Sequence, residues 1–213
     1  MTRTSYDAIA ADYSDLFRHE LETRPIERAA LAAFAELVRN ANPCSIVDVG
    51  CGPGRVTAHL GGLGADIFGI DLSPGMLAVA RKAYPELRFD EGSMLALDIP
   101  DGSVGGVLAW YSIIHIPDEL LPQVFAEFHR ILVPGGSALL GFQVGHRPLH
   151  LTEALGYEVS LDFHRRQPEH IAELLTEAGL VIHARVIREP AEGEGIEPTQ
   201  KAYLFARKPE TLQ

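Results

Sequence analysis

The sequence predicts an α/β domain with a doubly wound, mostly parallel sheet covered by helices on both faces. Short β-branched runs alternate with segments in which apolar residues recur every three or four positions, as strands alternate with helices in this class. A glycine-rich turn, 48–54, follows the first strand-like run, and Asp71 ends the second. The last two strand-like runs have no helix between them, so at least one pairing there is expected to be antiparallel.

The composition fits one globular domain over 1–213. Hydrophobic residues make up 46% and charged residues 22% of the chain. No apolar run approaches the roughly 20 residues that span a bilayer, and the N-terminus lacks the apolar core of a signal peptide, so we expect a cytoplasmic protein. A net charge of −11 disfavours a nucleic-acid partner. Cys44 and Cys51 lie at opposite ends of one predicted strand, too far apart for a disulfide.

The first half of the chain is expected to alternate helices and strands. In order they are helix 24–39, strand 45–49, helix 55–60, strand 66–70, helix 74–83 and strand 87–90. Ser73 is a good N-cap and Pro74 suits the first position of a helix. The segment 1–23 precedes this pattern and is interpreted as a lid.

The second half continues the alternation after 24–144, the expected ligand-binding core. The predicted elements are strand 104–110, helix 118–132, strand 137–144, helix 168–178 and strands 181–187 and 202–207. The last three form a C-terminal unit, 167–208, whose two strands are joined by the Pro/Gly/Glu-rich loop 189–199. Pro134-Gly135-Gly136 is expected to turn the chain into strand 137–144. The segment 145–166 has no assigned element and is a candidate substrate cover.

Three glycines at alternate positions, Gly50, Gly52 and Gly54, follow Asp48 in the turn. Glycine permits a tight turn and the close approach of a ligand, and the N–H groups that open the next helix favour an anionic group. A dinucleotide fingerprint, G-x-G-x-x-G, would need glycine where Arg55 stands. The spacing therefore disfavours a nicotinamide-dependent oxidoreductase, which stays the alternative enzyme class.

The turn and the acid that ends the next strand resemble motif I and the following acidic motif of the class I S-adenosylmethionine-dependent methyltransferases. The resemblance continues through Gly92-Ser93-Met94, 107–115 and 131–136, and it covers the chain from about residue 6 to residue 208. Within this family, the chain is similar to the small-molecule enzymes of ubiquinone and menaquinone biosynthesis. The resemblance implies a Rossmann-like seven-stranded sheet of order 3-2-1-4-5-7-6 with an antiparallel last strand. It also implies S-adenosylmethionine as cofactor, S-adenosylhomocysteine as product, no metal, and a small-molecule methyl acceptor.

The resemblance also implies a set of cofactor-binding residues. Asp48 would organise the turn near the methionine amino group, and Asp71 would hold the ribose hydroxyls. Ser93 replaces the acid that the family commonly places near the adenine. The full set is Tyr6, Tyr13, Asp48, Gly50, Cys51, Gly52, Gly54, Asp71, Leu72, Met76, Gly92, Ser93, Met94, Trp110, Tyr111 and Ser112. For several of these a structural role is the alternative, such as strand-end capping by Asp48 or core packing by Met76 and Trp110.

His115 follows the carboxyl end of strand 104–110, where the family presents residues beside the methyl group, and it is the candidate catalytic base. A structural histidine is the alternative. The histidines do not show metal-ligand spacing. His146 and His150 are four positions apart, but Pro148 between them disfavours the helix that would place them on one face. A non-catalytic domain that senses a cofactor or binds a partner remains a third interpretation of the chain.

Overall fold

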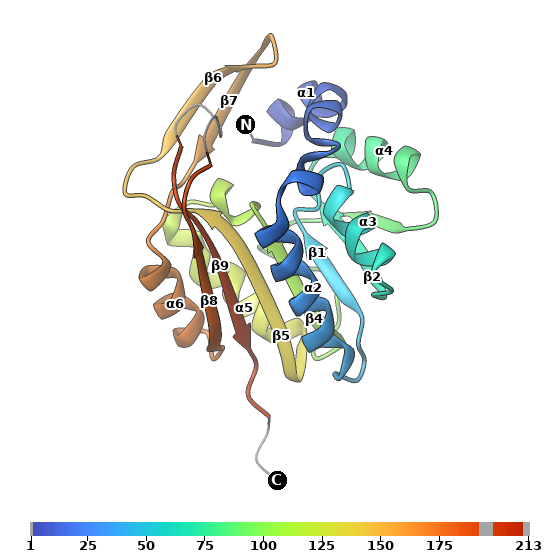
Figure 1. Cartoon of the computed structure of the whole chain (residues 1–213), viewed down its shortest axis with the longest axis vertical. Coiled ribbons are helices and arrows are strands. Elements are labelled where there is room, and N and C mark those ends of the chain that lie inside the picture. The colour runs from blue at the N-terminus through green and yellow to red at the C-terminus, as the bar shows by residue number, and fades with distance from the viewer. Residues whose placement is uncertain (1, 192–197, 211–213) are drawn as a thin grey trace.

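A seven-stranded sheet runs through the middle of the molecule (Figure 1). The computed structural model describes residues 2–191 and 198–210. The sheet has the order β3-β2-β1-β4-β5-β9-β8. Its strands are β1 (Ile46–Val49), β2 (Ile67–Asp71), β3 (Arg88–Glu91), β4 (Val104–Trp110), β5 (Leu132–Gln143), β8 (Val181–Arg188) and β9 (Lys201–Arg207). Only β9 runs against its neighbours, β5 and β8. Numbered within this sheet alone, the order is the predicted 3-2-1-4-5-7-6.

Helices cover both faces of this sheet. They are α1 (Thr2–Phe17), α2 (Pro25–Arg39), α3 (Arg55–Gly62), α4 (Pro74–Ala83), α5 (Leu121–Ile131) and α6 (Pro168–Glu177), with short 3₁₀ helices η1 (Glu20–Thr23), η2 (Ile113–His115) and η3 (Asp118–Leu120). The predicted cap of α4 is present, because the Ser73 hydroxyl accepts the Met76 N–H at 3.1 Å and Pro74 opens the helix.

Strand β4 explains why the core lies on both sides of the sheet. All seven of its residues are buried. Val107 and Ala109 belong to the core cluster formed with α5 and α6, whereas Leu108 and Trp110 belong to the cluster formed with α2 and α3. Successive strand side chains point to opposite faces, so an uninterrupted apolar strand is stable only between two helical layers.

Strand β5 begins at Leu132, earlier than the predicted 137. The expected turn at Pro134-Gly135-Gly136 is absorbed inside the strand, where the β4–β5 register shifts between Val104 and Gly106. Gly135 has a φ of 79°, a left-handed conformation that glycine adopts readily, and its N–H donates to the Lys208 carbonyl at 2.9 Å. The glycine pair therefore makes a bulge and does not break the strand.

The segment 145–166 holds a hairpin that was not predicted, made of β6 (Leu149–Ala154) and β7 (Tyr157–Phe163). Leu155 and Gly156 at its tip have φ values of 55° and 82°, as a two-residue type I′ turn requires. Leucine is unusual there, so the turn carries no recognisable sequence signal. The hairpin stands beyond the end of the sheet beside α1 (Figure 1), and Ile9 packs with Val159 of the hairpin.

Three further expectations concern the cysteines, a membrane-spanning helix and the loop 189–199. Cys44 and Cys51 are both free thiols, as predicted. Within the described residues, none of the helices is both long and apolar enough to cross a bilayer. The predicted loop 189–199 lies partly outside the described residues, which leave out 192–197.

Candidate active site

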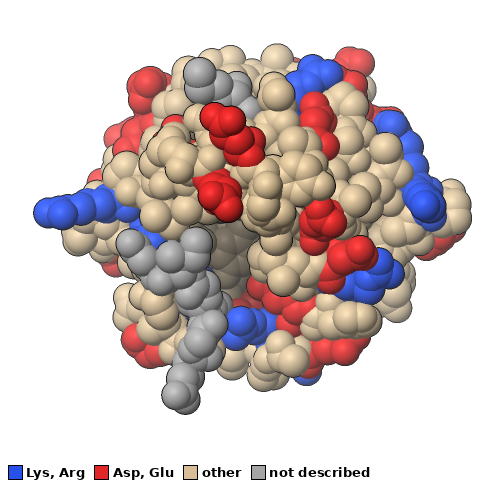
Figure 2. All heavy atoms as spheres, turned by 90° about the horizontal axis from the view of Figure 1, so that it is seen from above, with Lys and Arg blue, Asp and Glu red and all other residues tan. Residues whose placement is uncertain are grey.

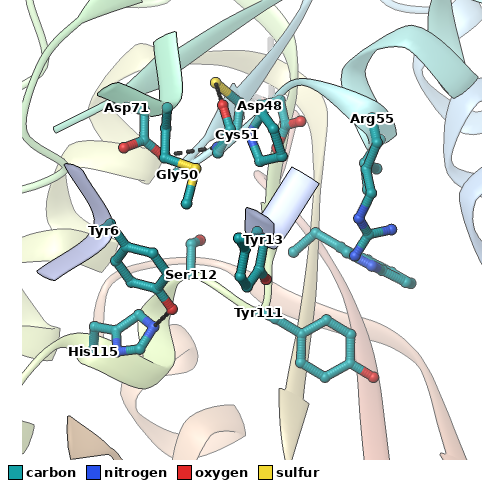
Figure 3. Close-up of a pocket in the computed structure, with 15 residues that line it drawn as sticks. Tyr6, Tyr13, Asp48, Gly50, Cys51, Arg55, Asp71, Tyr111, Ser112 and His115 are labelled. Atoms are coloured by element: carbon teal, nitrogen blue, oxygen red, sulfur yellow. Dashed lines mark hydrogen bonds between the residues drawn. The ribbon is translucent and has the colours of Figure 1, made fainter. Parts of the chain in front are cut away.

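The carboxyl ends of β1, β2 and β4 meet at one pocket, and α1 closes it from the other side (Figure 3). Ligands of open parallel sheets bind at this edge. The pocket holds about 610 Å³ of empty space, including the part open to solvent. Its lining consists of Tyr6, Tyr13, Asp48, Gly50, Cys51, Gly52, Pro53, Arg55, Val56, Asp71, Met76, Trp110, Tyr111, Ser112 and His115.

The three glycines of the turn have different tasks, although all have positive φ values between 55° and 80°. A Cβ on Gly50 would lie 2.3 Å from Cβ of Ser112, and a Cβ on Gly54 would lie 2.7 Å from the Phe89 ring. A Cβ on Gly52 would meet no described atom within 4 Å. The outer glycines therefore allow close packing, while Gly52 leaves its backbone open to a ligand.

Asp71 ends β2 and fastens the turn to α4. Its Oδ2 accepts the Gly52 N–H and its Oδ1 accepts the Ser73 N–H, both at 2.8 Å. A carboxylate has about four acceptor sites, so Asp71 keeps acceptor capacity for a ligand. Burial raises the pKa of Asp71, while hydrogen bonds from the backbone N–H groups of Ser73, Gly52 and Leu72 lower it.

Asp48 is a buried acid with one unused oxygen. It is 1% exposed, and its Oδ2 accepts the Thr57 hydroxyl at 2.7 Å. Its Oδ1 has no hydrogen-bond partner among the described residues. Burial raises the pKa of Asp48 to about 7. A donor from a ligand would satisfy this oxygen, since an unpaired buried polar atom is unfavourable.

The last residue of β4 and the residues that follow it are packed against β1 and β9. Trp110 stacks on Tyr203, with ring centroids 5.0 Å apart and planes 12° apart. Tyr111 has a φ of 54°, and its hydroxyl lies 2.9 Å from that of Tyr203. Ser112 donates to the Val49 carbonyl at 2.6 Å. This wall of the pocket is therefore aromatic and tied to β1 and β9.

His115 is held between the hairpin and α1. Its Nδ1 lies 2.8 Å from the Asp162 carbonyl, which can only accept, so Nδ1 carries the proton. Nε2 then accepts the Tyr6 hydroxyl at 2.7 Å (Figure 3). Burial lowers the pKa of His115 to about 4, and burial raises the pKa of Tyr6. At neutral pH the pair is a phenol that donates to a neutral imidazole.

We use the term cap for α1 together with the β6–β7 hairpin. Asp7 of α1 accepts the Ser73 hydroxyl at 2.6 Å and the Gly75 N–H at 2.8 Å, which fixes α1 to the start of α4. Ser5 accepts the Ser160 N–H at 2.9 Å, which fixes α1 to β7. The cap thus reaches both sides of the pocket mouth.

Arg166 anchors the chain that returns from the hairpin. Its buried guanidinium pairs with Asp118 at 2.9 Å and donates to the carbonyls of Ile113 and Ile116. These carbonyls lie on either side of His115. In the sequence Arg166 belongs to the run His164-Arg165-Arg166, which carries no sign that one member is buried.

Arg55 opens α3 at the rim of the turn (Figure 3). Its NH2 group pairs with Glu20 of η1 at 2.6 Å. The side chain is 14% exposed, and its NH1 group has no hydrogen-bond partner among the described residues. In the sequence, Arg55 is distinguished only by standing where a dinucleotide fingerprint would have glycine.

The structure brings twelve of the predicted residues to the pocket: Tyr6, Tyr13, Asp48, Gly50, Cys51, Gly52, Asp71, Met76, Trp110, Tyr111, Ser112 and His115. Gly54, Leu72, Gly92, Ser93 and Met94 do not line it. Leu72 is 45% exposed beside Asp71. Pro53, Arg55 and Val56 line the pocket and were not predicted. Among the described residues, no three His, Cys, Asp or Glu side chains gather as a metal site would require.

The central part of the chain is similar to known methyltransferases. Residues 46–136 match the family model of a methyltransferase domain. The chain is 35% identical over 144 residues to a demethylmenaquinone methyltransferase of Chlorobaculum parvum, covering 65% of this chain and 58% of that protein. It is 34% identical over 145 residues to a probable chloroplastic tocopherol O-methyltransferase of Oryza sativa, covering 63% and 38%. The chain spans little more than half the length of the first relative.

Solved structures share the fold. A 1,6-didemethyltoxoflavin-N1-methyltransferase of Burkholderia thailandensis, with S-adenosylhomocysteine bound, matches with a TM-score of 0.74 and 22% identity over 98% of this chain and 88% of that one. A methyltransferase of Methanosarcina mazei matches with a TM-score of 0.70 and 18% identity over 78% and 93%. At these identities the likeness establishes the fold alone.

Proposed function

We propose that this chain, whose residues 46–136 match the family model of a methyltransferase domain, is a class I S-adenosylmethionine-dependent enzyme that transfers a methyl group from S-adenosylmethionine to a small-molecule acceptor. One observation carries the proposal. Of the three glycines in the turn, only Gly52 faces open space, and it lines the same pocket as Asp71 and as Asp48, whose Oδ1 has no partner among the described residues. A nicotinamide-dependent oxidoreductase is disfavoured because Arg55 stands where the dinucleotide fingerprint needs a glycine.

The residues present fit the cofactor. The two carboxylate oxygens of Asp71 suit two adjacent ribose hydroxyls, and Oδ1 of Asp48 suits a donor such as the methionine ammonium. The open backbone at Gly52 suits the close approach of the ligand. Met76 lines the pocket beside these groups and offers an apolar surface for the adenine.

The protein's own task is orientation and the exclusion of water. S-adenosylmethionine, when bound, supplies a methyl group on a sulfonium that is reactive without covalent help. Trp110 and Tyr111 form a wall that is fixed from behind by Tyr203, and Tyr6 and Tyr13 reach in from the cap. Holding the acceptor in line and away from water is the main source of rate in such a site.

An acceptor oxygen or nitrogen must lose a proton, and we propose Tyr6 and His115 as its route. The acceptor proton passes to the Tyr6 oxygen while the Tyr6 proton passes to Nε2 of His115, whose Nδ1–H remains on the Asp162 carbonyl. Because the pKa of His115 is about 4, the imidazole is ready to accept at any pH above about 5 but is a weak base.

The role of His115 is tested by His115→Ala. We expect S-adenosylhomocysteine affinity to change little, and turnover of an identified acceptor to fall by about 10²–10⁴. The pH profile of the native enzyme should show no inflection near 6.5, the ordinary pKa of histidine. Turnover within about threefold of the native rate would leave His115 a packing residue.

The acceptor is proposed to be a planar ring compound. The relatives described above are named for demethylmenaquinone and tocopherol, and the aromatic wall of this pocket suits a flat ring. A nucleic-acid acceptor is disfavoured by the net charge of −11. Acidic and basic side chains are interspersed on the described part of the face seen from the cap end (Figure 2).

A cytoplasmic location belongs to the same proposal and is supported by the free thiols of Cys44 and Cys51.

A thermal-shift panel tests the function. We expect S-adenosylmethionine and S-adenosylhomocysteine to raise the melting temperature, since a ligand at 100 times its Kd stabilises a protein by about 2.7 kcal/mol. NAD and NADP should have no effect at the same concentrations. Stabilisation by a nicotinamide nucleotide and by neither adenosyl compound would contradict the proposal.

A further inference from the structure

A buried polar network lies behind the aromatic wall of the pocket, which consists of Trp110 and Tyr111. Besides Tyr111, its members are Glu27 in the first turn of α2, Arg188 at the end of β8 and Tyr203 in β9. Glu27 is 5% exposed, and Tyr203 is fully buried. The roles proposed above use neither Glu27 nor Arg188.

The hydrogen bonds of this network run in one direction, from the pocket to Glu27. Arg188 lies 2.8 Å from Oε1 of Glu27 and pairs with it. A carboxylate can only accept, so the Tyr203 hydroxyl donates its single proton to Oε1, at 3.0 Å. The Tyr111 hydroxyl must then donate to Tyr203, at 2.9 Å. Burial raises the pKa of both phenols, so both keep these protons at neutral pH.

Both residues of the aromatic wall depend on this support. Tyr111 has a φ of 54°, a left-handed conformation that is unfavourable for a residue with a Cβ and persists only where the surroundings fix it. Trp110 stacks on Tyr203 with ring centroids 5.0 Å apart, and a Cβ on Gly141 would come within 3.0 Å of the Trp110 ring. Tyr203 therefore holds Trp110 by its ring and Tyr111 by its hydroxyl.

We infer that Glu27 is a positioning residue, which acts through Tyr203 to fix the orientation of the aromatic wall against which a flat acceptor would lie. The inference rests on the proposed function, which assigns the acceptor to this wall. Glu27 itself does not line the pocket. A buried ion pair contributes little to stability compared with well-packed apolar side chains, so the pair of Glu27 and Arg188 is expected to contribute orientation more than stability.

Three variants of the whole chain test this role. Trp110 is the only tryptophan, so its fluorescence and its near-ultraviolet circular dichroism report on the wall. Tyr203→Phe keeps the ring that stacks on Trp110 and removes only the hydroxyl. Glu27→Gln keeps an oxygen that accepts the Tyr203 hydroxyl. The double variant Glu27→Leu/Arg188→Met removes this acceptor without leaving one buried charge unpaired.

Two matched controls accompany these variants. Tyr84→Phe removes a hydroxyl from the separate cluster of α4 and β3, and Glu36→Leu removes an exposed carboxylate from the same helix as Glu27. Calorimetry in saturating S-adenosylhomocysteine measures the binding of 2-naphthol, a flat phenol, and of decahydro-2-naphthol, which has the same skeleton with saturated rings. Far-ultraviolet circular dichroism and melting check that each variant is folded.

We expect Tyr203→Phe and the double variant to increase the quenching of Trp110 fluorescence by acrylamide and to reduce the near-ultraviolet signal. Both should bind 2-naphthol about threefold to tenfold more weakly, because a side chain that is no longer pre-organised must be immobilised on binding. The affinity for decahydro-2-naphthol should change by less than about twofold. Glu27→Gln and the two controls should match the native protein in every measurement.

An unchanged Trp110 signal in Tyr203→Phe would show that the hydroxyls do not orient the wall, and a native signal in the double variant would show that Glu27 does not. Equal losses of affinity for both probes would make the network a general part of the fold. Each of these results overturns the inference. If the double variant does not fold, Tyr203→Phe decides alone, because it removes the hydroxyl through which Glu27 reaches the wall. Native protein that binds S-adenosylhomocysteine but not 2-naphthol would contradict the flat acceptor proposed above, and the Trp110 signals would still decide the role of Glu27.

Discussion

The turn region, 46–76, and the cap are built in different ways although they enclose the same pocket. In the turn region, the Asp71 carboxylate accepts the N–H of Gly52, which is 19 residues away within one strand-turn-helix-strand unit. In the cap, Ser5 meets Ser160 across 155 positions and Tyr6 meets His115 across 109. The first region is specified by neighbours in the sequence, whereas the second exists only once the chain has folded. We therefore expect substitutions in the turn region to cost more than those in the cap.

The largest expected effect is that of Gly50→Ala. The new Cβ would lie 2.3 Å from Cβ of Ser112, in a left-handed conformation that alanine tolerates poorly. We expect a loss of about 2–5 kcal/mol in the free energy of unfolding, from backbone strain and overpacking together. Urea denaturation measures this loss.

Two other glycines serve as controls for this substitution. Gly52→Ala adds strain without a clash, so it should cost only about 1–2 kcal/mol while abolishing S-adenosylhomocysteine binding. Gly62→Ala lies at the end of α3, where the new Cβ meets no described atom within 4 Å and φ is ordinary. It should therefore leave both the stability and the binding unchanged. Equal stability of the Gly50 and Gly52 variants would contradict the division of tasks within the turn.

The same contrast explains which parts of the molecule could be predicted from the sequence. The order of the seven strands and the twelve predicted residues that line the pocket follow from local signals, such as the alternate glycines and the strand-ending Asp71. The β6–β7 hairpin was not predicted, because Leu155 occupies a turn position that normally signals itself with asparagine or glycine. Arg55 was missed as a lining residue because its partner, Glu20, is 35 positions away, and only the folded chain shows that NH1 is unpaired.

Asp71→Ala is expected to have the next largest effect, and it acts on two quantities. Two charge-assisted bonds to the ribose are lost, so affinity for S-adenosylhomocysteine should fall by more than about tenfold. Because Asp71 also accepts the N–H groups of Gly52 and Ser73, the ligand-free protein should lose about 1–3 kcal/mol of stability. Asp90→Ala, at an exposed pair with Arg88, is the control. An unaltered dissociation constant would remove Asp71 from the site.

Asp48→Asn should change stability in a manner that depends on pH. Burial raises the pKa of Asp48 from 3.8 to about 7, so the folded state favours the protonated acid. Protonated Asp48 therefore contributes its full stability to the fold below about pH 4. Between about pH 4 and 7 the unfolded chain binds fewer protons than the folded chain, so this contribution is lost as the pH rises. Asp48→Asn should therefore be more stable than the native protein at pH 8, by no more than about 4 kcal/mol, and equal to it near pH 4. Urea titrations at the two pH values measure the difference, and parallel curves would contradict an ionised, buried Asp48.

The smallest effect is expected in the cap, for Tyr6→Phe. The substitution removes only the hydroxyl that donates to Nε2 of His115 at 2.7 Å, and one such bond contributes about 0.5–1.5 kcal/mol. The other hydrogen bonds of α1, which Asp7 forms with the start of α4 and Ser5 forms with β7, should keep the global melting temperature nearly unchanged. Local opening should become easier, so the amides of α1 should exchange hydrogen several-fold faster in the ligand-free protein, since covering elements come from the least stable part of a fold.

Hydrogen exchange with and without S-adenosylhomocysteine, read by mass spectrometry over α1 and over α5, measures this opening. If α1 covers a bound cofactor, the ligand should slow exchange in α1 of both proteins and leave the buried face of α5 unaffected. Tyr84→Phe is the matched control, because the Tyr84 hydroxyl makes no hydrogen bond with the described residues and its ring packs against the separate cluster of α4 and β3. Faster exchange in α5 as well as in α1 would mean that Tyr6 stabilises the whole fold. Unchanged exchange in α1 would mean that the bond to His115 does not hold the cap, and the contrast between the two regions would then rest on Asp7 and Ser5 alone.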